Sequence, residues 1–69
     1  MAAMTEREKQ QALLPHWIEH NAEHAAEFRR WAHVASGAEP EIEAAATQLE
    51  AANAALTIAL EKLRADGSA

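Results

Sequence analysis

The chain has 69 residues, no cysteine, and a net charge of −5 from eleven acidic and six basic residues. Nineteen residues are alanine, which leaves fifteen larger apolar side chains for a core. A monomer of this size buries only about 60% of its unfolded surface. The absence of cysteine excludes disulfides and thiolate zinc sites. The negative charge disfavours nucleic acid and anionic membranes as partners, and the small core favours oligomerisation. Because no apolar run could span a bilayer and no hydrophobic signal region is found, we expect a cytoplasmic protein.

Two helices joined by one short break are predicted to form a single domain over residues 1–69. Helix one, about 6–35, begins with a capping box in which Thr5 accepts from the Glu8 N–H and the Glu8 carboxylate reaches back to Thr5. Pro15 predicts a kink in an otherwise continuous helix. The turn is expected at 36–39, with Gly37 as a left-handed cap, and Pro40 opens helix two, about 40–65.

Both helices carry a stripe of mainly apolar residues at alternating intervals of three and four, which is typical of a packed helix seam. Helix one presents Leu14, Trp17, Asn21, His24, Phe28, Trp31 and Ala35. Helix two presents Ile42, Ala45, Leu49, Ala52, Leu56, Ala59 and Leu63, and the stripe is widened by Ala46, Asn53 and Leu60. Bulky side chains facing alanines favour an antiparallel hairpin. Since one partner helix cannot cover so wide a stripe, we expect an all-α homodimer in which two hairpins form a four-helix bundle with two-fold symmetry. The residues expected in its core or interface are Leu14, Trp17, Phe28, Trp31, Leu49 and Leu56.

A histidine ladder is the feature of this sequence most suggestive of chemistry. His16, His20 and His24 are four residues apart, so their imidazoles stack on one helix face, and a glutamate follows each histidine by three residues. The candidate ligands are His16, His20, His24 and Glu27, for nickel, zinc or copper, while Asn21 and Glu23 are expected to support them or fix register. His20, His24 and Glu27 form the preferred set, because His24 is expected to point inward. Helix two has no histidine, so water, a carboxylate or a second copy would complete the shell.

Other interpretations stay open beside the metal site. Asn21 and His24 could instead form a buried polar pair that fixes register and dimer state without metal. The ladder also contains His-x-x-Glu-His strings typical of some metalloproteases, but two short helices cannot wall a substrate cleft. A di-iron bundle would need Glu-x-x-His pairs, which are absent. We therefore expect a non-enzymatic protein. The remaining charged residues are expected to be solvated or to complement helix ends: Arg29, Arg30, His33, Glu39, Glu41, Glu43, Lys62 and Arg64.

The segment Leu13–Ala32, and above all Pro-His-Trp-Ile-Glu-His-Asn at 15–21, resembles a small helical module of unassigned function. That module is associated with C-terminal extensions of CooT-type nickel-binding accessory proteins. The resemblance implies that His16, His20, Asn21, Glu23 and His24 belong to the module's own motif, and that nickel or another transition metal is its context. The chain lacks the nickel-binding domain and the histidine-rich linker of those proteins.

Overall fold

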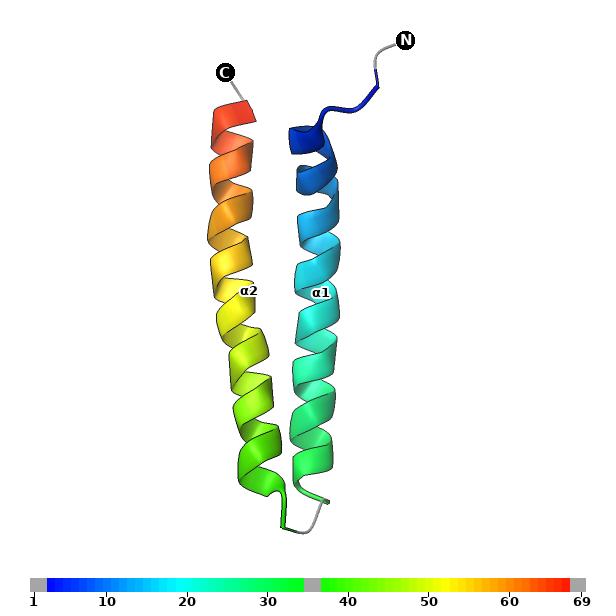
Figure 1. Cartoon of the computed structure of the whole chain (residues 1–69), viewed down its shortest axis with the longest axis vertical. Coiled ribbons are helices and arrows are strands. Elements are labelled where there is room, and N and C mark those ends of the chain that lie inside the picture. Colours follow the sequence, from blue (N-terminus) through cyan, green and yellow to red (C-terminus); the bar gives the residue numbers. More distant parts are fainter. Residues whose placement is uncertain (1–2, 35–36, 68–69) are drawn as a thin grey trace.

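The computed structural model describes residues 3–34 and 37–67, and in this part of the chain it contains two helices and no strand. Helix α1 is Glu6–Ala32 and helix α2 is Glu39–Gly67. The helices lie antiparallel and side by side, so that α1 begins at the end of the molecule where α2 finishes (Figure 1). The hairpin measures 55 × 22 × 12 Å and is a single layer of two helices. The expected all-α hairpin is confirmed.

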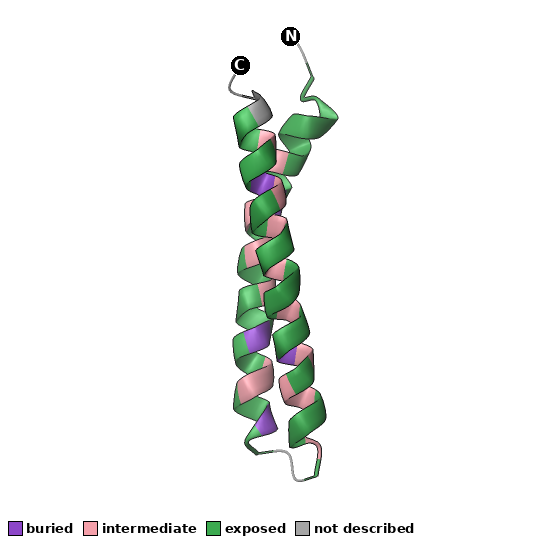
Figure 2. Ribbon diagram, turned by 90° about the vertical axis from the view of Figure 1, so that its left-hand side faces the viewer, coloured by how far each residue is buried: buried purple, intermediate pink, exposed green. Residues whose placement is uncertain are grey.

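The start of α1 follows the predicted capping box. The Glu8 N–H donates to Thr5 Oγ1 at 3.1 Å, and the Thr5 N–H donates to Glu8 Oε1 at 2.8 Å. These two bonds satisfy donors that the first turn of a helix otherwise leaves unpaired. The helix then continues through Pro15 without a break, and in Figure 2 its first turns lean to one side of α2.

The connection between the helices differs slightly from the prediction. Helix α1 ends at Ala32, three residues early, and α2 begins at Glu39, so Pro40 is its second residue. Gly37 has φ +85°, which confirms the left-handed conformation, but it lies in the turn and does not directly cap α1. Helix α2 extends to Gly67, two residues beyond the predicted end. Ala35, Ser36 and Ser68 lie outside the described residues.

The contact between the helices uses a seam that differs from the predicted one in α1. The buried side chains are few and small: Leu14, Ala25, Ala32, Ala46 and Leu60. The prediction that Trp17, His24 and Trp31 pack against α2 is wrong, because all three are exposed in the single hairpin. Phe28, Leu49 and Leu56 are half-buried. Alanine occupies little space and lets the two helix axes approach, whereas a tryptophan between them would force them apart.

A polar pair in the middle of the hairpin fixes how the helices are aligned. Asn21 donates from Nδ2 to Asn53 Oδ1 at 3.1 Å, and Asn53 donates from Nδ2 to the Ile18 carbonyl at 2.9 Å. Near the open end, Gln11 donates to the Leu63 carbonyl at 2.9 Å. Asn21 therefore pairs with Asn53 and not with His24. A sliding of one helix along the other would break both asparagine bonds in a partly buried place, so they specify register.

The hairpin by itself has little core. Buried positions occur singly along the helices, separated by half-buried and exposed ones (Figure 2). Among the buried residues in the described part of the chain, only Leu14 and Leu60 are larger than alanine. No helix in the described ranges is long and apolar enough to cross a membrane.

Candidate functional site

The histidine ladder forms on the outside of α1. The ring centroids of His16 and His20 are 5.3 Å apart, as are those of His20 and His24, and the His24 ring lies 6.3 Å from the Phe28 ring. All three histidines are exposed in the single chain. The predicted alignment of the imidazoles on one face is confirmed, but His24 does not point toward α2, because Ala25 takes that place.

The two neighbouring histidine pairs differ in orientation. The rings of His16 and His20 are stacked, with an interplanar angle of 25°, whereas those of His20 and His24 are edge-on at 68°. A ligating imidazole holds the metal ion in its ring plane, through a ring nitrogen. Planes at 25° in a stacked pair meet far from both rings, whereas planes at 68° meet close to them. His20 and His24 are therefore the pair best oriented to share an ion.

A complete ligand shell does not form in one chain. Among residues 3–34 and 37–67, no group of three or more histidine or carboxylate side chains is placed to hold a metal ion. The Glu27 carboxylate instead lies 3.9 Å from the guanidinium of Arg30. Within the described residues, a single hairpin thus brings neighbouring histidines together without assembling three or more ligands.

One side of the hairpin is apolar and carries two hollows of similar size. The first, about 340 Å³, is lined by Gln10, Leu14, Trp17, Ala59, Lys62 and Leu63. The second, about 360 Å³, is lined by Phe28, Trp31, Glu41, Ile42 and Ala45. Trp17 and Trp31 are two heptads apart on α1, as are Ala45 and Ala59 on α2, so both hollows open on the same side. We call this side the tryptophan face.

The two tryptophans of this face stand out from the hairpin. Trp17 is 44% exposed and Trp31 is 59% exposed. His24 lies seven residues from each of them and therefore occupies the same face between the hollows. Of the stripe predicted on α2, Ile42, Ala45, Ala59 and Leu63 line the two hollows. Its widening residues Ala46 and Leu60 are buried, and Asn53 bonds to Asn21 of α1.

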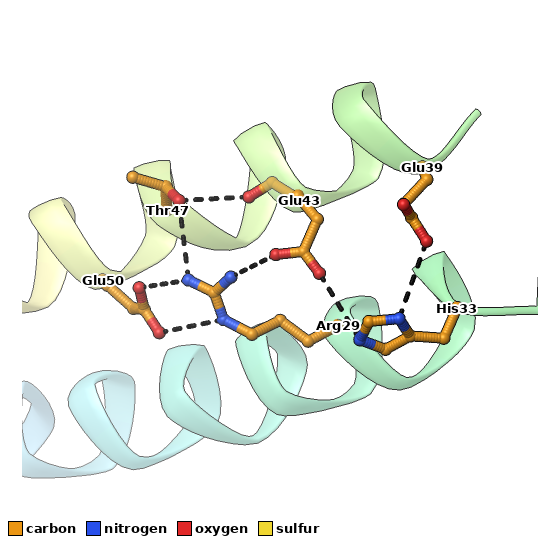
Figure 3. A network of polar contacts seen from close by, with 6 residues as sticks. All are labelled: Arg29, His33, Glu39, Glu43, Thr47 and Glu50. Carbon is orange, nitrogen blue, oxygen red and sulfur yellow. Dashed lines mark hydrogen bonds and ion pairs between the residues drawn. The ribbon is translucent and has the colours of Figure 1, made fainter.

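On the opposite side of the hairpin, charged side chains form hydrogen bonds and ion pairs between the two helices (Figure 3). The Arg29 guanidinium donates to both Glu43 and Glu50, with Nε 3.3 Å from Glu50 Oε2, and its Nη2 lies 3.5 Å from Thr47 Oγ1. The hydrogen bond to Glu50 raises the pKa of Arg29, and the charges of both carboxylates act in the same direction. The expectation that Arg29 is merely solvated is wrong.

Beside this network, His33 continues the polar side toward the turn. His33 is exposed, as predicted, and its Nδ1 lies 3.6 Å from the Glu39 carboxylate. Glu43 thus contacts Arg29 of α1, and Glu39 contacts His33 just after the end of α1, as well as both lying near the start of α2. The sequence contains a signal for the network, because Glu43 and Glu50 are a heptad apart, but only the alignment of the helices identifies Arg29 as their partner.

Replacing Arg29 with methionine is expected to lower the melting temperature, because two inter-helix ion pairs are lost while the aliphatic stem is kept. The loss should shrink when sodium chloride is raised to about 1 M, since partly exposed charges are screened. Thermal unfolding followed by circular dichroism at both salt concentrations checks this. Arg30→Met is the matched control, because Arg30 pairs with Glu27 of its own helix. Equal losses in the two variants at low salt would contradict the role of the network.

The comparisons with known proteins give one match. The family described as Domain of unknown function (DUF8180) matches residues 10–63, which span most of both helices and more than half of the chain. No curated protein and no solved structure matches. The similarity to the extensions of nickel accessory proteins therefore stays a prediction. The matched region contains the histidine ladder, the Asn21–Asn53 pair and the tryptophan face, and the chain belongs to the DUF8180 family.

Proposed function

We propose that the chain is a non-enzymatic, self-associating helical module in which two copies pair through their tryptophan faces to form a four-helix bundle. The observation that carries the proposal is the exposure of Trp17 and Trp31 on one side of the hairpin. Large apolar groups gathered on one face of a soluble protein mark an interaction surface. The polar residues that line the two hollows are Gln10, Lys62 and Glu41, and all the others are apolar.

The thinness of the hairpin supports a second copy as the occupant. Domains are normally built from two packed layers, and a single layer of two helices has no second layer to cover its apolar side. Because only two buried residues in the described ranges are larger than alanine, burial within one hairpin contributes little to stability. A second copy supplies the missing layer and has the same need, so the pairing is mutual and closed by two-fold symmetry.

The positions of the hollows favour one orientation of the two copies. The Asn21–Asn53 bond places Ala22 of α1 level with Ala52 of α2. Ala45 and Ala59, one at each hollow, are each seven residues from Ala52. Consider a two-fold axis that lies in the interface, perpendicular to the helices, at this level. It places the Trp17 hollow of one copy over the Trp31 hollow of the other.

Charge complementarity supports the same orientation. Lys62 lines the first hollow and lies ten residues after Ala52, and Glu41 lines the second and lies eleven residues before it. The perpendicular axis brings Lys62 of each copy level with the partner's Glu41. A parallel arrangement would instead gather both copies of Lys62 at one end of the bundle and both copies of Glu41 at the other, without pairing opposite charges.

Sedimentation equilibrium tests the proposal by measuring the mass of the chain in solution. We expect twice the chain mass of 7.5 kDa for the unchanged protein. Trp31→Glu should give a monomer, because it buries a charge in the proposed interface. Ile58→Glu is the matched control, since Ile58 is 54% exposed and contributes to neither hollow. A monomeric parent chain, or dissociation by Ile58→Glu as readily as by Trp31→Glu, would overturn the proposal.

A further inference from the structure

The two-fold axis of the proposed pairing passes between His20 and His24 of the histidine ladder. A metal site formed there rests on that pairing. The axis lies at the level of Ala22, and His20 and His24 are each two residues from Ala22. His20 of one copy is therefore level with the partner's His24, and the reverse. His24 shares its face with Trp17 and Trp31, so pairing removes its imidazole from water. A buried imidazole left without a polar partner is destabilising.

The spacing of the two imidazoles in one chain fits a shared ion. Two imidazoles bound to one tetrahedral ion at about 2.0–2.1 Å have ring centroids about 5.2 Å apart. The observed distance between the His20 and His24 centroids is 5.3 Å, with an interplanar angle of 68°. The spacing and the ring angle within one chain thus suit a shared ion, and the second copy would supply the two ligands that a single hairpin lacks.

We propose that His20 and His24 of two paired chains bind one divalent transition-metal ion on the two-fold axis. Four imidazoles without thiolates suit zinc, nickel or copper, and not the oxygen-seeking magnesium or calcium. The net charge of −5 on each chain favours the binding of a cation over that of an anion. His16 lies on the far side of His20 from the axis, its ring is stacked on that of His20, and it takes no part in the site.

Titration of the untagged chain with zinc chloride, by isothermal calorimetry at neutral pH, tests this site. We expect saturation at one ion per two chains. His24→Leu should lower the affinity by more than about 100-fold, beyond the about 10–100-fold effect of losing a supporting group around a metal. His16→Ala, the control from the same ladder, should leave both affinity and stoichiometry unchanged. Circular dichroism confirms that each variant is helical.

Mass measurement on the same samples separates the site from the pairing. His24→Leu should remain a dimer without zinc, because leucine fills the interface position with an apolar side chain. A dimeric parent chain without saturable zinc binding would overturn the metal site and leave the pairing intact. Binding of one ion per chain, or an affinity lowered as much by His16→Ala as by His24→Leu, would overturn the shared site. A parent chain that stays monomeric with or without zinc would overturn the pairing itself.

Discussion

Replacing Leu60 with alanine is expected to reduce the free energy of unfolding by about 2–5 kcal/mol. Leu60 is 7% exposed and is one of two buried side chains larger than alanine in the described part of the chain. Its truncation removes apolar contacts and leaves a cavity that two straight helices cannot easily close. Urea unfolding followed by circular dichroism measures the change, at one fixed protein concentration because association contributes to stability.

Ile58→Ala is the control for this truncation. Ile58 lies on the same helix, two residues away, but is 54% exposed. Its replacement should change stability by less than about 0.5 kcal/mol, as surface substitutions usually do. If Ile58→Ala were as harmful as Leu60→Ala, the assignment of the inner face of α2 would be wrong.

Replacing Ala46 with leucine is expected to destabilise the hairpin by about 1–3 kcal/mol, through overpacking. Ala46 is fully buried between the helices, at 0% exposure, and two of the three buried residues of α1, Ala25 and Ala32, are also alanines. The added carbon atoms would have to separate the helices, which would also stretch the Asn21–Asn53 bond. The same urea unfolding measures the effect.

Ala44→Leu provides the comparison, because Ala44 is exposed on the same helix. Leucine and alanine are both strong helix formers, so helix propensity changes little in either variant. Ala44→Leu should therefore leave stability nearly unchanged. A gain in stability from Ala46→Leu would mean that the helices are not in close contact at this level.

Most of the fold could be predicted from the sequence, because its signals are local. The Thr5–Glu8 capping box, the left-handed Gly37 and the continuous helix through Pro15 each depend on a few neighbouring residues. The observed helix ends differ from the predicted ends by up to three residues, because helix ends fray and are the least sharply defined part of a helix.

The inner face of α1 could not be predicted in the same way. The positions Leu14, Asn21 and Phe28 belong to two overlapping stripes, and intervals of three and four fit both. One stripe adds Trp17, His24 and Trp31, and the other adds Ile18, Ala25 and Ala32. Hydrophobicity favours the first, whereas close helix packing selects the second because its residues include alanines. The tryptophans are consequently left on the surface.

The candidate site could be predicted only in part for the same reason. The spacing of His16, His20 and His24 is a local property and correctly indicates their common face. The partner of Asn21 and the partners of Arg29 come from the other helix, so they depend on the alignment of the hairpin. A sequence pattern within one helix does not contain that alignment.

Pairing of two copies through the tryptophan faces, about an axis at the level of Ala52, is tested most directly by a single engineered cysteine. The chain has no cysteine of its own, so Ala52→Cys and Ala54→Cys each introduce one thiol at an exposed alanine. On the proposed axis the two copies of residue 52 face each other, within the reach of a disulfide. Residue 54 points away from the tryptophan face. We predict that mild oxidation at low protein concentration converts the Ala52→Cys variant into a covalent dimer, while the Ala54→Cys variant stays uncrosslinked. Crosslinking of Ala52→Cys at the same rate as Ala54→Cys, or more slowly, would contradict the pairing.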